Sequence, residues 1–286
     1  MNNIDISIIN DEISNDFNEV ISFCIEQNLN FIDIRSFKGK NISELSYKEA
    51  TYLHKSLVSS GISVSSISSP LFKWYQRNDN SNSKPDLYYM KSFYSMEEKK
   101  DLIKRTLDIC SILKSPSVRV FSGLQSDTSS NQNFFEKEIE LYTYLLSIAN
   151  NAGIKIMLEN EPECNFNTVK DMLSFGDFLF SKEISILLDI GNIYKQSLML
   201  NLYELKKVCK FLSNNIHIKD IDLHNKKFVP FGDGDIPYGR FLEEIFKSTN
   251  HDRHILTIET HVLQDKKNAS AKSLENLRKY ISYLNL

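Results

Sequence analysis

IKIMLE, at residues 154–159, is an apolar run that ends in a carboxylate, and three later stretches repeat its form. These stretches are ISILLD at 184–189, NIHIKD at 215–220 and HILTIE at 254–259. Each run carries at or near its end a side chain that can bind a metal, in the order Glu159, Asp189, His217 and Glu259. These residues are 30, 28 and 42 positions apart, and a strand, its crossover helix and the next parallel strand need about 30 residues. Each stretch therefore predicts the strand of one βα unit.

The alternation of β-branched runs and helical stretches continues along the whole chain. This alternation is typical of a parallel sheet with helical crossovers. The expected strands are residues 4–9, 30–35, 62–67, 117–121, 154–159, 184–189, 214–218 and 255–259. We therefore predict an α/β fold, a (β/α)8 TIM barrel formed by residues 1–286 as a single domain. All four metal-competent side chains would then leave the same edge of the barrel, where the active sites of such enzymes lie.

Composition limits the classes of partner. The chain has 286 residues, of which 41% are hydrophobic and 25% charged, as expected for a globular domain with a large core. Its net charge of −3 offers no basic surface for a nucleic acid. The N-terminus lacks a basic, apolar leader, and no apolar run is long enough to cross a membrane. We expect a cytoplasmic protein with no nucleic acid or membrane partner, and a homo-oligomer is possible.

Other local signals concern packing. The four cysteines form no CxxC pair, so we expect them in the core and in neither a zinc knuckle nor a redox pair. Ser46 with Glu49 and Ser95 with Glu98 have the spacing of capping boxes at helix N-termini. Apolar residues at helical spacing predict a final helix over residues 272–284.

Two connections, residues 69–94 and 220–238, are longer than a compact barrel needs. Long loops in compact domains are often functional, so we expect both to lie over the C-terminal mouth. The first contains the single tryptophan, Trp74, beside charged residues. An exposed Trp74 could cover a polar substrate. Alternatively, the aromatic cluster packs the loop down or forms a subunit contact.

The four strand-end residues offer three carboxylates and one imidazole. This mixed set of ligands suits Mn²⁺, Mg²⁺, Co²⁺ or Zn²⁺. One carboxylate at a strand end often caps the following helix, but four in register favour a shared ion. We therefore expect one divalent metal ion as cofactor, without a preference among the four.

Five strings in the second half of the chain carry a further signal: LENE at 158–161, LLDIGN at 187–192, IHIKD at 216–220, VPFGDGDI at 229–236 and IETH at 258–261. They resemble the xylose isomerase-like barrel superfamily, among its sugar phosphate isomerase/epimerase members, which include tagatose and psicose epimerases. The resemblance implies a barrel enzyme that acts on a small-molecule carbohydrate.

The resemblance also implies roles for the strand-end residues. Glu159, Asp189, His217 and Glu259 match residues that bind one divalent ion, and the two glutamates match residues that exchange protons with the substrate. A bound ion can stabilise an ene-diolate while a carboxylate reaches the neighbouring proton. Return of a proton to the opposite face gives an epimer, and return to the neighbouring carbon gives an isomer. The expected activity is a metal-dependent isomerase or epimerase of a sugar or sugar phosphate.

One position departs from the family pattern. Many relatives carry a substrate-contacting histidine where this chain has Asn192, and an amide forms hydrogen bonds but does not exchange protons near neutral pH. The DNA-repair endonuclease branch of the fold gathers extra histidines around three zinc ions. This chain has only six histidines, and His54, in a helical stretch, is badly placed to join such a site, which counts against that branch. His224, His251 and His254 are expected at the surface.

Three further residues are candidates for contact with the substrate. Lys219, two residues beyond the histidine, could meet a hydroxyl or phosphate, or pair with Glu161 or Asp220. His261, two residues beyond the last glutamate, lies on the same side as that glutamate if the strand continues. Glu161 shares a strand face with the first glutamate and could instead orient a ligand.

Two other functions stay open. The same metal site could direct the carbanion to β-elimination, which would make the protein a dehydratase or lyase acting on a keto-polyol. A non-catalytic carbohydrate-binding barrel is also compatible with Asn192 and with the unusual loop at 69–94.

Overall fold

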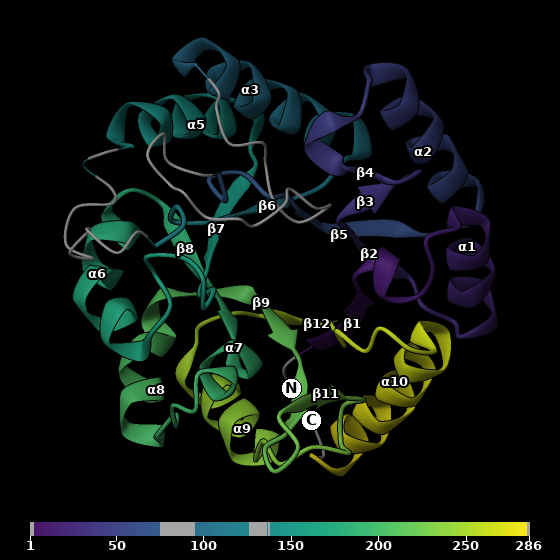
Figure 1. Cartoon of the computed structure of the whole chain (residues 1–286), viewed down its shortest axis with the longest axis vertical. Coiled ribbons are helices and arrows are strands. Elements are labelled where there is room, and N and C mark those ends of the chain that lie inside the picture. The colour runs from purple at the N-terminus through teal and green to yellow at the C-terminus, as the bar shows by residue number, and fades with distance from the viewer. Residues whose placement is uncertain (1–2, 75–94, 126–135, 137, 285–286) are drawn as a thin grey trace.

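Eight parallel strands form a nearly closed barrel at the centre of the molecule, and helices surround it (Figure 1). The computed structural model describes residues 3–74, 95–125, 136 and 138–284. Hydrogen-bonded neighbours follow the order β1-β12-β9-β8-β7-β6-β5-β2, and a bridge between Ile9 and Asp33 brings the two ends of this sheet together. The predicted (β/α)8 barrel is therefore confirmed.

The barrel strands lie close to their expected positions. Their bounds are β1 (Asn3–Ile8), β2 (Phe31–Ile34), β5 (Ser63–Ser68), β6 (Ser117–Val120), β7 (Lys155–Glu159), β8 (Ile184–Asp189), β9 (Leu212–Ile218) and β12 (Arg253–Ile258). Two short hairpins follow barrel strands: β3 (Ser36–Phe37) with β4 (Lys40–Asn41), and β10 (Asp220–Asp222) with β11 (Lys227–Val229). The second hairpin lies within the expected loop at 220–238, whereas residues 75–94 of the other loop lie outside the described residues.

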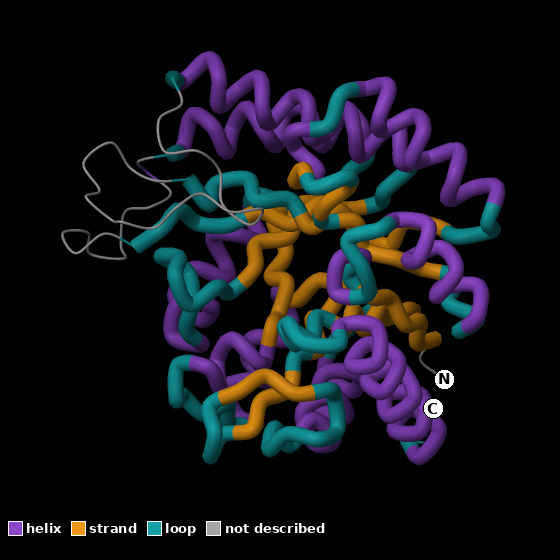
Figure 2. The backbone as a smooth tube through the Cα atoms, turned by 45° about the vertical axis from the view of Figure 1, so that its right-hand side comes forward, coloured by secondary structure: helices purple, strands orange, loops and turns teal. Residues whose placement is uncertain are grey.

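Helices cover the outside of the barrel, with the strands enclosed (Figure 2). They are α1 (Phe17–Glu26), α2 (Tyr47–Ser59), α3 (Met96–Leu113), α5 (Ile139–Ala152), α6 (Val169–Ser181), α7 (Ile190–Lys195), α8 (Leu202–Val208), α9 (Tyr238–Ser248) and α10 (Lys266–Tyr283). Ser46 and Ser95 form the predicted capping boxes, and the final helix begins earlier than predicted, at Lys266. All four cysteines are free and buried. In the part of the chain that the structure describes, no helix has the length and apolar character needed to span a bilayer.

The strand register places a ring of polar side chains inside the barrel. Residues paired in a parallel ladder present their side chains on the same face of the sheet. Asp189 pairs with His217, and His217 pairs with Thr257. Nearer the start of the chain, Ser68 pairs with Arg119. All five side chains are buried, so the interior of the barrel is polar near its C-terminal mouth.

His254, in β12, is buried, which corrects the expectation that it lies at the surface. Its Nε2 is 2.8 Å from Thr249 Oγ1, and this contact holds the ring within the wall of the barrel. Burial, assisted by the nearby His251, lowers the pKa of His254 from 6.5 to about 4. Between pH 6.5 and about 4, His254 therefore binds a proton in the unfolded chain but not in the folded protein.

The stabilising contribution of neutral His254 is present above pH 6.5 and is lost as the pH falls from 6.5 to about 4. Allowing for solvent screening, we expect this acidification to remove roughly 1–2 kcal/mol of the free energy of unfolding. Urea titrations at both ends of this range should show a smaller acid loss in His254→Phe than in the wild type. His54→Gln, on α2, is the control, and an unchanged acid loss in His254→Phe would contradict the assignment.

Candidate metal centre

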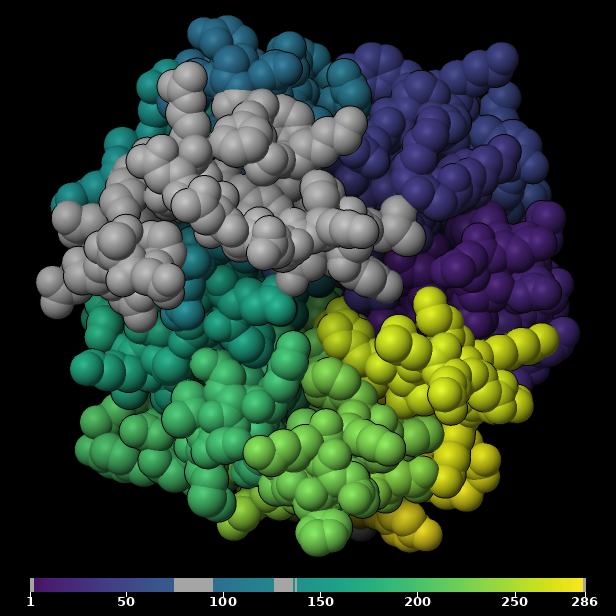
Figure 3. All heavy atoms as spheres, viewed as in Figure 1, coloured from purple at the N-terminus to yellow at the C-terminus, as the bar shows by residue number. Residues whose placement is uncertain are grey.

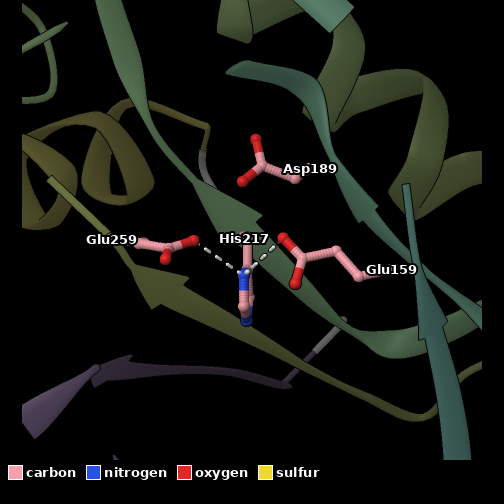
Figure 4. A group of neighbouring side chains, drawn as sticks. All are labelled: Glu159, Asp189, His217 and Glu259. Carbon is pink, nitrogen blue, oxygen red and sulfur yellow. Dashed lines mark hydrogen bonds and ion pairs between the residues drawn. The ribbon is translucent and has the colours of Figure 1, made fainter. Parts of the chain in front are cut away.

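Glu159, Asp189, His217 and Glu259 converge at the C-terminal mouth of the barrel (Figure 4). They lie at the ends of β7, β8 and β9 and directly after β12. One potential ligand atom from each residue lies within 4.8 Å of those from the other three. The exposed fractions of the four residues are between 0 and 3%. The structure thus brings together the side chains whose spacing predicted a common site.

His217 lies between the two glutamates. Its Nδ1 is 3.2 Å from Glu259 Oε2 and 3.6 Å from Glu159 Oε1. Burial lowers the pKa of this imidazole, but the two carboxylates outweigh burial and raise the pKa to about 10. While no metal is bound, the ring therefore carries a proton on Nδ1 at neutral pH. That proton has to leave before Nδ1 can bind an ion.

Lys219 is a buried cation inside the same cluster, with a side chain that is 1% exposed. Its Nζ is 2.9 Å from Asp189 Oδ2 and 3.1 Å from Glu259 Oε2. Burial lowers the pKa of the ammonium group, but these carboxylates outweigh burial and raise its pKa above the usual value. Lys219 is therefore an internal counter-ion. The sequence left open whether Lys219 contacts the substrate or pairs with Glu161 or Asp220. The structure shows ion pairs with two other acids, Asp189 and Glu259, which belong to the candidate metal centre.

An arginine holds each of the two glutamates. Arg119 Nη1 donates a hydrogen bond of 3.0 Å to Glu159 Oε2, and Arg35 Nη1 donates one of 2.7 Å to Glu259 Oε1. Arg119 is itself fixed by the carbonyl of Ser68, which accepts from Nη2 at 3.1 Å. These charge-assisted bonds fix one oxygen of each glutamate and leave the other directed at His217.

Both glutamates are ionised at neutral pH. At Glu159, burial raises the pKa, but Arg119 and His217 outweigh burial and lower it to about 2. At Glu259, burial also raises the pKa, but Lys219 and the other neighbouring cations lower it well below its usual value. Two carboxylates that stay ionised in a buried site can accept protons or bind a cation.

Asn192 links the cluster to the rim of the barrel. Its Nδ2 donates to Glu159 Oε1 at 3.3 Å and to Glu161 Oε2 at 3.2 Å. Its Oδ1 accepts from Lys219 Nζ at 3.1 Å. Glu161 also forms an ion pair of 3.2 Å with Lys73. Asn192 is buried, with an exposed fraction of 1%, and it connects the carboxylates of Glu159 and Glu161. Glu161 also lines the open mouth.

His261 reaches the cluster through a turn, because β12 ends before it and its φ is 52°. Its Nε2 still lies 2.9 Å from Glu259 Oε1, on the expected side. Together with Glu12, these residues form a second group of three potential metal ligands. Arg35 already occupies that group, because it pairs with Glu12 at 2.6 Å and with Glu259 at 2.7 Å. We therefore assign no metal to this second group.

A cavity of about 290 Å³ opens beside the cluster at the mouth, a volume suited to a small molecule. Its lining carries charges of both signs: Glu12, Arg35, Lys73, Arg119, Glu161, Glu163, Lys195, Glu259, His261 and Lys266, with Phe121, Phe228 and Leu263. Phe228, on β11, meets His261 edge-on with ring centroids 5.2 Å apart. The green hairpin segment and the yellow segment after β12 accordingly lie side by side on this face (Figure 3).

Trp74 does not lie at the surface, so the expectation of an exposed tryptophan is wrong. Its side chain is 1% exposed and packs against Phe72, with ring centroids 4.8 Å apart. Its Nε1 donates to Glu138 Oε1 at 3.1 Å, and Lys99 Nζ lies 4.7 Å from the ring centroid. The described residues that line the mouth cavity do not include Trp74. The aromatic cluster therefore packs the start of the loop down, which was the alternative interpretation.

Three residues that the sequence analysis did not single out also shape the site. The Asn160 side chain donates to the Asp189 carbonyl at 2.9 Å and accepts from its amide at 2.8 Å. A Cβ at Gly191 would come within 2.5 Å of the Lys219 carbonyl, so a glycine is needed for this close approach. Asn160 and Gly191 lie within the LENE and LLDIGN strings, but no sequence signal indicated Arg35, which binds Glu259 across 224 positions.

A family model described as the xylose isomerase-like TIM barrel matches residues 24–280. The chain belongs to this family. The resemblance inferred from the strings in its second half is therefore confirmed. Comparison with curated proteins finds no match.

Solved structures with the xylose isomerase-like barrel superpose on nearly the whole chain. The IolI protein with a bound zinc atom has a TM-score of 0.72 and 15% identity, over 98% of both chains. A D-allulose 3-epimerase from Methylomonas sp. has a TM-score of 0.72 and 14% identity, over 98% of this chain and 99% of that one. The probable 3-DHS dehydratase AsbF from Bacillus anthracis has a TM-score of 0.70 and 16% identity, over 96% and 98%. At these identities the likeness shows the fold.

Proposed function

We propose that this protein is a metal-dependent isomerase or epimerase of a sugar or sugar phosphate. The observation that carries the proposal is the meeting of Glu159, Asp189, His217 and Glu259 in one buried cluster at the barrel mouth. Membership of the xylose isomerase-like family supports an enzyme, and one structural neighbour is a D-allulose 3-epimerase. A small carbohydrate is accordingly the proposed substrate class. A cytoplasmic location remains a prediction from the sequence.

The chemistry of the cluster fits one divalent ion. Three carboxylates and one imidazole can surround an ion such as Mn²⁺, Co²⁺, Zn²⁺ or Mg²⁺. We propose that Glu159, Asp189, His217 and Glu259 hold this ion. When bound, the ion supplies a Lewis acid that polarises a substrate carbonyl. The zinc atom in the IolI structure supports a metal in this family.

Glu159 and Glu259 are the proposed proton-transfer residues. They lie on opposite sides of the His217 ring (Figure 4). A sugar held between them would present one face of a carbon atom to each carboxylate. Because both carboxylates are ionised, either can remove a proton. Lys219 keeps its own proton and lies 3.1 Å from Glu259, so it stabilises the ionised form of that carboxylate between turnovers.

The substrate-binding roles divide according to position. We propose that His261 and Glu161, which line the mouth cavity, contact the substrate. Asn192 and Lys219 would position the carboxylates that carry out the chemistry. The loops at 69–94 and 220–238 are proposed to cover the mouth, and the β10–β11 hairpin supports this for the second loop.

A second candidate activity is dehydration of a keto-polyol at the same site. Elimination of a hydroxyl group requires a proton donor beside the leaving oxygen. Lys219 is a protonated group inside the cluster, and one structural neighbour is a probable 3-DHS dehydratase. The two activities differ in product mass, because isomerisation conserves mass and dehydration removes water.

Chelation is expected to abolish turnover, and one divalent ion per chain should restore it. The test is metal analysis of the purified protein, followed by a screen of ketoses and keto-polyols in D₂O. Deuterium at carbon without other change of mass supports an isomerase or epimerase, and loss of water supports the dehydratase. Full activity of verified metal-free protein would contradict a metal-dependent reaction. Sugar binding without exchange or water loss would favour a non-catalytic barrel.

A further inference from the structure

The far side of the His217 ring is buried inside the barrel. Its Nδ1 is directed at the two glutamates, and its Nε2 points away from them (Figure 4). Among the described residues, Nε2 has no hydrogen-bond partner, although His217 is 0% exposed. A buried N–H group without a partner is costly, and histidines that bind metals almost always donate their second N–H to an acceptor.

Asp33, on β2, is a buried carboxyl group that matches this requirement. It is 0% exposed, and neither of its oxygens makes a hydrogen bond of good geometry to a described residue. The strand register pairs Asp33 with Ser66, so these side chains lie on the same face of the sheet. Ser68, two residues further along the strand, shares this interior face with Arg119.

Asp33 and His217 interact electrostatically. Burial raises the pKa of Asp33 to about 6, and among the charged groups that oppose this increase His217 is the strongest, followed by Arg119 and Arg35. The nearby Ser68 hydroxyl also lowers the pKa of Asp33. The two residues form no direct hydrogen bond or ion pair in the described structure.

We propose that Asp33 is a positioning residue for the metal-binding histidine, and that it accepts the His217 Nε2–H through one buried water molecule. A buried water is stable where it can make about three hydrogen bonds. Here His217 donates, Asp33 accepts, and the hydroxyl groups of Ser66 and Ser68, which have no partner among the described residues, complete the site.

This arrangement would fix the tautomer of the metal-binding ring. With its proton held on Nε2, His217 presents the lone pair of Nδ1 toward Glu159 and Glu259. The carboxylate on the far side also makes the imidazole a stronger ligand. The inference rests on the proposed metal site but adds a residue from the first quarter of the chain, on β2, across the barrel from β9.

The test compares Asp33→Asn and Asp33→Leu with wild type, using zinc alone as the probe. We expect Asp33→Leu to weaken zinc binding about 10- to 100-fold in a competition titration, and Asp33→Asn to weaken it less. A merely structural acid would change the stability of the metal-free protein and leave the zinc affinity of the folded variants unchanged.

A spectroscopic measurement reports the tautomer directly. In zinc-loaded wild type with ¹⁵N-labelled histidine, His217 should show one protonated Nε2 with slow exchange, and Asp33→Leu should lose this slow exchange. Ser7→Ala, which removes another buried hydroxyl of the interior, is the matched control and should keep wild-type zinc affinity. If Asp33→Leu does not fold, Asp33→Asn carries the same test.

Unchanged zinc affinity and an unchanged His217 signal in the Asp33 variants would overturn the inference. Failure of the wild type itself to bind zinc would instead count against the proposed metal site, so the two failures are distinguishable.

Discussion

Glu159→Gln and Glu259→Gln are each expected to lower turnover by about 1,000-fold or more, because each change removes a proton-transfer group. Glutamine keeps the size of the side chain and an oxygen that can face His217. The folded barrel should therefore survive, and circular dichroism should match wild type. Turnover is measured on whichever substrate the D₂O screen identifies. Glu275→Gln, an exposed change on α10, is the matched control and should keep full activity.

The two variants should differ in which epimer of the substrate still exchanges its proton for deuterium. If the glutamates serve opposite faces, each variant retains deuterium exchange from one epimer and loses it from the other. This pattern would be visible by NMR of the separated epimers. Equal loss of exchange from both epimers in both variants would instead indicate a single proton-transfer base. Full activity in either variant would contradict its proposed role.

Lys219→Met is expected to destabilise the metal-free protein by about 3–5 kcal/mol, because Asp189 and Glu259 lose a buried cation. Added Zn²⁺ or Mn²⁺ should recover most of this loss, since a divalent ion supplies positive charge to the same carboxylates. The variant should also bind the ion more tightly than wild type, because no ammonium group has to move. Denaturant titrations with and without metal measure both effects.

Lys210→Met is the control for this experiment. Lys210 pairs with Asp177 on the surface, where the two side chains are 62% and 84% exposed, so its loss should change the free energy of unfolding by less than about 1 kcal/mol. Metal-free Lys219→Met that is as stable as wild type would show that the lysine does not neutralise the cluster. A stability loss that metal does not recover would show that the ion binds elsewhere.

The sequence predicted the barrel and the convergence of four residues because both depend on local periodicity. Each strand is a short apolar run, and each potential ligand follows the run that positions it. The interior charges were not predictable in the same way. Arg35 binds Glu259 across 224 positions, and Asp33 is separated from His217 by most of the chain. No spacing rule connects residues that meet only because the barrel closes.

The errors concern side chains whose environment depends on neighbours distant in sequence. Trp74 stands among charged residues, which indicated a surface position, but Phe72 and Lys99 enclose it. His254 stands beside charged residues and yet faces Thr249 and Phe246 within the wall of the barrel. For His254, the neighbouring Arg253 pairs with Asp5 near the surface, whereas the imidazole ring packs against Phe246.

The choice between aspartate and glutamate in the cluster follows from what comes after each strand. Helix α7 begins at the residue after Asp189, and Asp189 Oδ1 accepts the amide hydrogen of Asn192 while Oδ2 faces Lys219. A short acid can thus start a helix with one oxygen and offer the other to a cation. Glu159 and Glu259 precede irregular segments, so neither carboxylate has to cap a helix. Exchanging Asp and Glu between these positions would shift a carboxylate oxygen by about the length of a methylene group, and at position 189 it would also displace the oxygen that caps α7.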